Sequence, residues 1–368
     1  MKTHFFLLQH MKSLISIDWL SVTFFGSWRT EQLEEVKQEF PISCAKYMTV
    51  KRLPYGSRQF KYLDEIYINK KLFCTIQSEP YSTKILNPRM LIVKLSNYYL
   101  YRMDGLSTFM EFILINKWEF HNISRLDICC DMDEFLYFPC GQFIADYAGG
   151  KYRHIGKSRG NMFFVQKNLN AITYNGLKFG LGENDCCIYL YNKTLELNEN
   201  NKNKPYIRDK WKKAGLKDDV WRLEVSLHSG AMKYKEKETG NTVHITLDML
   251  KDMGQISRIY YTYTNTLWQF IVYRDDIRNV TREKRVKFFD MPIKLTRWVI
   301  REDVIAHTLS DKIAIKRLHT SADNYHKGDL VQDEGATRLM ATEIAESTDL
   351  MEWYIKKKFD WDKEEQTK

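Results

Sequence analysis

Three short segments carry polar residues whose types and spacing could cleave a phosphodiester. They surround Asp127, Tyr191 and Glu224 and read S-R-L-D-I-C-C-D, Y-L-Y-N-K and W-R-L-E-V-S-L. Side chains of an extended strand alternate between its two faces, so the polar residues of each segment share one face. These groups are Arg125, Asp127, Cys129 and Asp131; Tyr189, Tyr191 and Lys193; and Arg222, Glu224, Ser226 and His228. Three such strands side by side would bring carboxylates, tyrosines and cations together, which is costly unless a metal or phosphate binds there.

A tyrosine among carboxylates and cations can cleave DNA by nucleophilic attack. The hydroxyl of Tyr191 would attack phosphorus and form a covalent phosphotyrosine. Carboxylate oxygens suit Mg²⁺ or Mn²⁺, which would polarise the phosphodiester and stabilise the leaving oxygen. Because tyrosine ordinarily ionises at about pH 10, we expect either the metal or Lys193 to lower the pKa of Tyr191.

The order of four segments resembles the Rep_trans replication initiation factors, which serve rolling-circle plasmids and some phages. The segments are I-D-W-L-S-V-T-F from Ile17, S-R-L-D-I-C-C-D, I-Y-L-Y-N-K-x-x-E from Ile188, and W-R-L-E-V-S-L, within residues 13–230. This resemblance implies an enzyme that cuts one DNA strand with a tyrosine and stays on the 5′ phosphate. The 3′ hydroxyl is then left for a polymerase. Relaxases of conjugative elements are related to this family.

The resemblance also implies roles for individual residues. The nucleophile is the tyrosine directly before the Asn-Lys pair, which is Tyr191, and Lys193 belongs to the catalytic group. Tyr189 departs from the family, which often has a basic or polar residue there, so either tyrosine could attack or Tyr189 could serve a second transfer. The metal ligands correspond to Asp127, Asp131 and Glu224, whereas Arg125, Lys193, Glu196 and Arg222 fall on other recurrent positions. Of these, we expect Arg125 and Arg222 to bind DNA.

Each segment also has a purely structural interpretation. An Arg-Leu-Asp or Arg-Leu-Glu triplet in a strand is commonly a surface ion pair beside a buried leucine. An Asn-Lys pair commonly opens a turn. The joint pattern of the segments favours a nuclease site, and a polar sheet face without chemistry is the alternative.

The chain has an excess of basic residues, and some of them are clustered in the sequence. The formal net charge is +9, which fits a polyanionic partner such as DNA. Two clusters could line a groove for single-stranded DNA: Lys151, Arg153, Lys157 and Arg159 among glycines, and Lys210 and Lys212 around Trp211. A flexible surface loop is the alternative for the first cluster, and a Trp211 that packs a short helix onto the sheet is the alternative for the second.

Cysteine use and hydropathy predict a cytoplasmic protein that does not enter a membrane. Seven cysteines without C-x-x-C spacing suit a reducing compartment and buried apolar positions. The apolar run near the first methionine is too short for a secretory signal, and no segment approaches the roughly 18 apolar residues of a spanning helix.

The hydrophobic pattern predicts an α+β fold with a central antiparallel sheet and helices on one face. Strands are expected at 14–25, 58–66, 72–78 and 90–96, followed by a helix at 106–117. The helices would leave the opposite face open for DNA. We expect a flexible extension at 1–12, a nicking domain at 13–245 and a smaller, mainly helical region at 246–368 that binds DNA or a partner. In this last region, Thr246 is expected to cap a helix through Met253, and 260–273 to be buried.

The function expected first is a rolling-circle replication initiator that nicks one strand of its origin. Single-stranded and duplex origin DNA would be its partners, with a helicase and a second copy of the chain as further candidates. A relaxase of a mobile element, a non-catalytic DNA-binding protein of the same fold and a metal-dependent nuclease that uses water are the alternatives.

Overall fold

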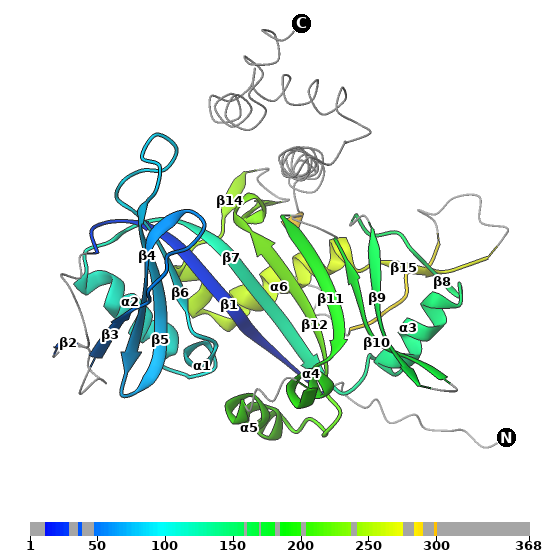
Figure 1. Ribbon diagram of the computed structural model, residues 1–368. Helices are drawn as coiled ribbons and strands as arrows, with labels where there is room; N and C mark the ends of the chain where they lie inside the picture. Colours follow the sequence, from blue (N-terminus) through cyan, green and yellow to red (C-terminus); the bar gives the residue numbers. More distant parts are fainter. Residues whose placement is uncertain are drawn as a thin grey trace, which may run out of the picture. The chain divides into compact units, whose positions relative to one another are not determined.

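A continuous antiparallel sheet positions the three polar segments (Figure 1). The computed structural model describes residues 12–28, 36–38, 48–157, 160–168, 171–180, 185–199, 204–236, 241–274, 283–289 and 298–299, all within one compact unit. In these residues the sheet has eleven strands in the order β2-β3-β4-β5-β6-β1-β7-β12-β11-β10-β9. The strands are β1 (Ser13–Phe25), β2 (Val36–Gln38), β3 (Met48–Arg52), β4 (Phe60–Ile68), β5 (Lys71–Pro80), β6 (Met90–Leu95), β7 (Glu119–Met132), β9 (Asn161–Asn168), β10 (Ala171–Phe179), β11 (Cys186–Asn192) and β12 (Trp221–His228). The predicted α+β class with a large antiparallel sheet is therefore confirmed.

The register of the central strands brings the predicted polar residues onto one face. Strands β11, β12 and β7 are neighbours, as the sequence pattern requires. Arg222 on β12 pairs with Asp131 on β7 and with Tyr191 on β11. Apolar residues alternate with these polar ones, so Leu126 and Leu223 are fully buried on the opposite face.

Three helices share the core on this apolar face: α2 (Gly105–Ile115), α3 (Cys140–Ala148) and α6 (Met253–Leu267). The longest of them, α6, contacts β1, β7, β11 and β12 and crosses behind these strands in Figure 1. Its Tyr260 hydroxyl donates to the carbonyl of Leu223, and Phe109 of α2 and Phe143 of α3 are fully buried in the same cluster. These helices bury the apolar side of the sheet and leave the polar side to other elements.

One end of the polar face carries a second, smaller cluster of buried residues. Here lie α1 (Asn97–Leu100), α4 (Lys193–Glu199) and α5 (Pro205–Ala214), and α1 and α5 contact β1. The buried members of this cluster are Tyr101, Leu197, Ile207, Trp211, Leu216 and Val220. Trp211 therefore packs α5 onto the sheet, which was the structural alternative for this residue.

Most of the predicted elements are found within a few residues of their expected bounds. The strands expected at 14–25, 58–66, 72–78 and 90–96 are β1, β4, β5 and β6, and the helix expected at 106–117 is α2. The predicted extension at 1–12 lies almost entirely outside the described residues. Within these residues, no helix is both long enough and apolar enough to cross a membrane.

The segment after residue 246 contributes to the same core as the sheet. The helix predicted to end at Met253 in fact begins there, because Asp252 caps α6 by accepting a hydrogen bond from the Gly254 amide at 2.8 Å. A 3₁₀ helix, η2 (Asp248–Lys251), precedes it, and η1 (Ser229–Ala231) follows β12. Tyr260 and Tyr263 are buried as predicted, but Tyr273 is 48% exposed.

The remaining strands form two small sheets. Strands β8 (Tyr152–His154) and β15 (Phe270–Val272) pair with each other, and β13 (Lys233–Glu236) lies between β14 (Thr242–His244) and β16 (Trp298–Val299). The rest of the predicted C-terminal region, from residue 300 onward, lies outside the described residues.

Candidate active site

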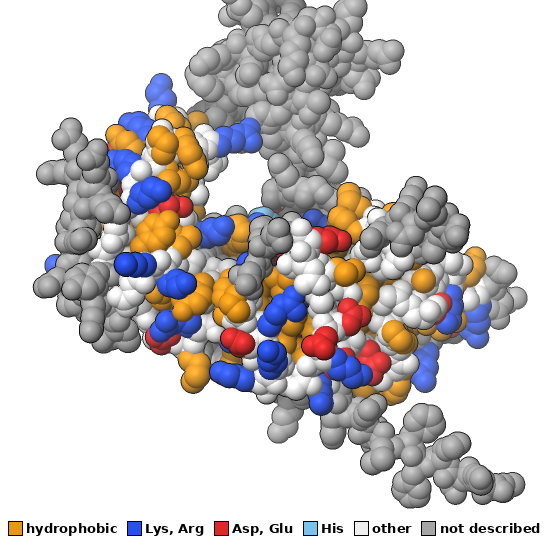
Figure 2. Space-filling view, turned by 60° about the horizontal axis from the view of Figure 1, so that its bottom comes forward, with side chains coloured by type: hydrophobic (Ala, Val, Ile, Leu, Met, Phe, Trp, Pro, Cys, Tyr) orange, Lys and Arg blue, Asp and Glu red, His pale blue; other side chains and the backbone are white. Residues whose placement is uncertain are grey.

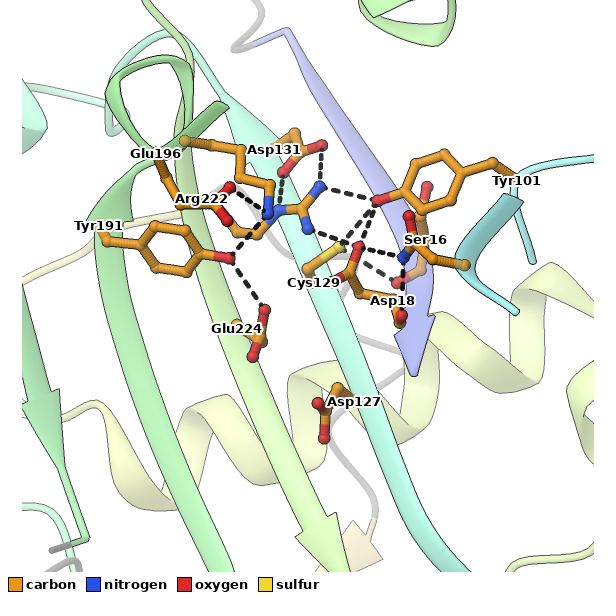
Figure 3. Close-up of polar contacts among 12 residues, drawn as sticks. Ser16, Asp18, Tyr101, Asp127, Cys129, Asp131, Tyr191, Glu196, Arg222 and Glu224 are labelled. Carbon is orange, nitrogen blue, oxygen red and sulfur yellow. Dashed lines mark hydrogen bonds and ion pairs between the residues drawn. The ribbon is translucent and has the colours of Figure 1, made fainter. Parts of the chain in front are cut away.

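Tyr191 lies at the end of β11, where the chain leaves the sheet and enters α4. Its hydroxyl donates a hydrogen bond to Oε2 of Glu224 at 3.1 Å, and Nζ of Lys193 donates to the same hydroxyl at 3.3 Å (Figure 3). Lys193 also pairs with Oε2 of Glu196 at 2.8 Å. The tyrosine oxygen thus lies between a carboxylate and an ammonium group, as the sequence pattern predicts.

Burial and the neighbouring carboxylate favour the protonated form of the Tyr191 hydroxyl. Burial, followed by the charge of Glu224, raises the pKa of Tyr191 well above its ordinary value. Burial, together with the Asp18 and Asp127 carboxylates, also raises the pKa of Glu224 to about 7. The protein groups around Tyr191 therefore raise its pKa and do not lower it, whereas the effect expected of a metal stays a prediction.

Arg222 is fully buried at the centre of the polar face and holds the neighbouring strands together. Its Nε and Nη2 bind the two oxygens of Asp131 at 2.6 and 2.9 Å, and its Nη1 binds Oδ1 of Asp18 at 2.7 Å. Nη2 also donates to the hydroxyl of Tyr101 at 2.7 Å. Because its side chain is 0% exposed, Arg222 has no surface to offer DNA, which corrects the expected contact.

Asp131 and Asp18 belong to this buried network. Trp211 donates its indole N–H to Oδ2 of Asp131 at 2.7 Å, in addition to the two bonds from Arg222. Burial acts to raise the pKa of Asp18, but Arg222, Lys193 and a hydrogen bond from Tyr101 together hold that pKa well below its usual range. Two carboxylates therefore share one guanidinium, and both oxygens of Asp131 are occupied by protein groups.

Asp127 forms a separate pair further along β7. Arg125 binds its two oxygens at 3.1 and 2.7 Å, and the hydroxyl of Ser226 donates to Oδ1 at 2.6 Å. The described part of the chain contains no group of three His, Cys, Asp or Glu side chains that could hold a metal ion. Asp127, Asp131 and Glu224 consequently do not fit a single Mg²⁺ or Mn²⁺ site as they stand here.

A cluster of cations lies beside Asp127, and only Arg125 of this cluster was predicted. The ring of Trp19 on β1 is flanked by Nζ of Lys94 at 3.3 Å and by the guanidinium of Arg125 at 4.2 Å. Burial, then the charges of Arg125 and Lys204, lowers the pKa of Lys94. Cations that crowd each other in this way favour a bound anion. In Figure 2, Lys and Arg side chains lie beside a group of acidic side chains at the end of the sheet near α4 and α5.

Asp18, Trp19 and Tyr101 are site residues that the sequence pattern alone did not single out. Asp18 and Trp19 belong to the first segment of the family resemblance, but regular alternation would put them on opposite faces of the sheet. A register shift between Ile17 and Trp19 places a bulge at Asp18. The bulge directs Asp18 to Arg222 and still leaves Trp19 against Arg125.

A pocket of about 480 Å³ opens over Tyr191. Its walls come from β9, β10, β11, β12 and α4. The lining residues are Phe164, Val165, Asn175, Tyr189, Tyr191, Asn192, Leu195, Glu196, Glu199 and Glu224. Both tyrosines that the sequence left open as nucleophiles therefore face one cavity.

The predicted basic clusters lie on other elements. Lys151 pairs with Asp146 at 2.5 Å, and Arg153 on β8 lines a second pocket of about 510 Å³. Lys157 is exposed, and Arg159 lies outside the described residues.

The second cluster is on α5, where Lys210 lies 5.0 Å from the ring of Tyr101 and Lys212 is exposed. Their binding to DNA remains a prediction.

Comparison with known proteins adds a likeness of fold. No protein-family model and no curated protein matches this sequence. Among solved structures, the chain is similar to a rolling circle replication initiator protein from Geobacillus stearothermophilus, with a TM-score of 0.42 and 13% identity. The similarity covers 82% of this chain and 96% of that chain. Agreement this low does not assign a function, so any assignment depends on the geometry of the site.

Proposed function

We propose that this chain is a rolling-circle replication initiator that nicks one DNA strand with Tyr191. The observation that carries the proposal is the position of the Tyr191 hydroxyl, which contacts both a carboxylate and an ammonium group at the floor of an open pocket. A tyrosine held only for packing needs one hydrogen-bond acceptor, as Tyr260 finds in the carbonyl of Leu223, and does not need an ammonium group as well. Attack on phosphorus needs both a proton acceptor and a positive charge.

The geometry supports a direct sequence of bond changes. Glu224 accepts the proton of the Tyr191 hydroxyl, along the hydrogen bond that already joins them. The tyrosine oxygen forms a bond to phosphorus while the bond from phosphorus to the 3′ oxygen breaks. The 3′ oxygen takes a proton from solvent, which leaves a free 3′ hydroxyl and a 5′-phosphotyrosine. Lys193 offsets the negative charge that develops near the tyrosine oxygen.

The cations near Trp19 supply a place for the phosphate backbone of the same strand. Lys94 and Arg125 are held against the ring, and Lys204 is close enough to influence Lys94. All three lie on the polar side of the strands that carry the acids. A single strand that crosses this face would place its phosphates on these cations before it reaches Tyr191.

A divalent metal is a separate part of the prediction. The three predicted ligands do not form one group, and Asp131 is engaged with Arg222 and Trp211. No step above depends on a metal. Dependence on Mg²⁺ or Mn²⁺ stays a prediction, as do a helicase partner and a homodimer.

Cleavage of an end-labelled single-stranded oligonucleotide that carries the origin tests the proposal. Wild type should cut it once, and the variants Tyr191→Phe and Glu224→Gln should bind it without cutting. Cleavage that persists in Tyr191→Phe would favour a nuclease that uses water. Binding without cleavage by wild type would favour a DNA-binding protein that lacks the chemistry. A substrate from a transfer origin cut in preference to a replication origin would favour a relaxase.

A further inference from the structure

Three aromatic rings form a row that leads from the surface to the hydroxyl of Tyr191. Phe164 on β9 lies 4.9 Å from Tyr189, and Tyr189 stacks on Tyr191 with ring centroids 4.3 Å apart and planes tilted by 25°. Phe164 is 37% exposed, Tyr189 is half-buried and Tyr191 is only 8% exposed. The row thus forms one wall of the pocket and becomes more buried toward the reacting group.

The strand beneath the row is shaped to let Tyr189 lie flat. Gly176 on β10 faces the tyrosine ring, and a Cβ at this position would lie 2.9 Å from Cε2 of Tyr189 and 3.1 Å from the carbonyl of Leu190. Any larger residue would push the ring away from the sheet. A glycine here lets the Tyr189 ring approach the strand closely while the ring still lines the pocket.

Most of the other side chains that line the pocket carry hydrogen-bond acceptors. Asn175 and three glutamates, Glu196, Glu199 and Glu224, surround the aromatic wall. Carboxylates repel phosphate groups, so the DNA backbone is favoured only at the Tyr191 hydroxyl, where Lys193 supplies a positive charge, and not along the rest of this lining. Carboxylates accept hydrogen bonds from amino groups, as acidic side chains do from the exocyclic amine of cytosine.

We propose that Phe164 and Tyr189 form a stacking site for one nucleobase of the DNA strand, beside the nucleotide that reacts at Tyr191. The acceptors around it favour a base with an exocyclic amino group over thymine. The role assigned to Tyr189 is stacking through its ring, so its hydroxyl is dispensable. Burial, then Glu224 and Glu196, raises the pKa of this hydroxyl, which agrees with a role other than attack. The identity of the ligand as single-stranded DNA rests on the proposed function.

Binding of fluorescein-labelled homopolymers of dA, dC and dT, about 15 nucleotides long, tests this site without knowledge of the origin. Fluorescence anisotropy should show weaker binding of dT than of dA and dC. Phe164→Ala and Tyr189→Ala should each weaken the binding of dA and dC about 10-fold, the loss expected for one stacked base. Tyr189→Phe should bind as wild type does. Phe120→Ala is the matched control, because Phe120 is 38% exposed on β7 but lies outside the pocket.

Two results would overturn the stacking site. One is a loss in Tyr189→Phe as large as that in Tyr189→Ala, which would assign the effect to the hydroxyl. The other is unchanged binding in both alanine variants, with melting temperatures that show them folded. Equal binding of dT, dA and dC would overturn the preference for an amino group. A chain that binds as proposed but never cuts origin DNA would contradict the nicking function and leave the stacking site standing.

Discussion

The hydroxyl of Tyr191 donates a hydrogen bond of 3.1 Å to Glu224 on the adjacent strand. This bond joins a tyrosine whose pKa is raised by burial to a carboxyl group whose pKa is raised to about 7. The tyrosine keeps its proton at neutral pH, and the carboxylate that can take it is present in a useful fraction. Efficient proton transfer is expected of a base whose pKa lies near the working pH.

Nicking should therefore depend on pH through Glu224. The rate is expected to rise with pH and to level off above about pH 7, because only the carboxylate form accepts the tyrosine proton. Single-turnover cleavage from pH 5 to 9 measures this profile. The Glu224→Gln variant should lose most of the rate and the transition near pH 7, whereas a wild-type rate that does not change over this range would exclude Glu224 as the base.

Glu224 should also make folding stability depend on pH. Its pKa of about 7 in the folded protein exceeds the ordinary value of 4.5, so the folded state binds more protons between these values. The contribution of this group to stability is thus present below about pH 4.5 and is lost as the pH rises to about 7. Urea unfolding at pH 5 and pH 8 should show wild type losing stability relative to Glu224→Gln. A constant difference between the two proteins would contradict the raised pKa.

Asp131 should matter for stability more than for metal binding. Its substitution by asparagine leaves the buried Arg222 with Asp18 as its remaining charge partner, and breaking a buried ion pair costs about 3–5 kcal/mol. Asp133→Asn is the control, because Asp133 accepts an exposed hydrogen bond from the Lys217 amide and should cost about 1 kcal/mol. Denaturant unfolding compares the two variants. An equally small loss of unfolding free energy in Asp131→Asn would show that the network around Arg222 does not hold these strands together.

Lys94 should contact DNA phosphate. Replacement by glutamine is expected to weaken the binding of single-stranded DNA and to reduce the slope of log affinity against log salt by about 1, the change for one lost phosphate contact. Lys51→Gln serves as control, because Lys51 is exposed on β3, away from the site strands.

Arg153→Gln tests the predicted basic loop by the same measurement. A smaller slope of log affinity against log salt in Arg153→Gln would show that DNA contacts β8. An unchanged slope in Lys94→Gln would show that DNA does not contact the cations near Trp19.

Local periodicity was enough to predict which side chains of β7, β11 and β12 share a face. Alternation with period 2 follows from strand geometry, so Asp127, Tyr191 and Glu224 could be grouped without a structure. It could not show how deeply each side chain is buried. Arg222 and Asp131 have the same alternation as Arg125 and Asp127, yet only the former pair is sealed by Trp211, which comes from α5, 80 residues along the chain from Asp131.

Features that depend on pairing between distant segments were missed. The bulge at Asp18 arises where β1 pairs with β7, and the sequence of β1 alone gives no sign of it. Phe164 reaches Tyr189 only because β9 and β10 extend the sheet beyond β11. The start of α6 was misplaced because Thr246 and Asp252 are both good capping residues, and only the packing of Ile256 and Tyr260 against the sheet selects the second.

The most direct test of the account is the site of covalent attachment. Protein incubated with a single-stranded origin oligonucleotide, with Mn²⁺ present, should form an adduct that survives denaturation, and peptide mass mapping should place the nucleotide on Tyr191. The Tyr189→Phe variant should form the same adduct, and Tyr191→Phe should form none. An adduct on Tyr189, or complete cleavage with no adduct on either tyrosine, would contradict Tyr191 as the nucleophile.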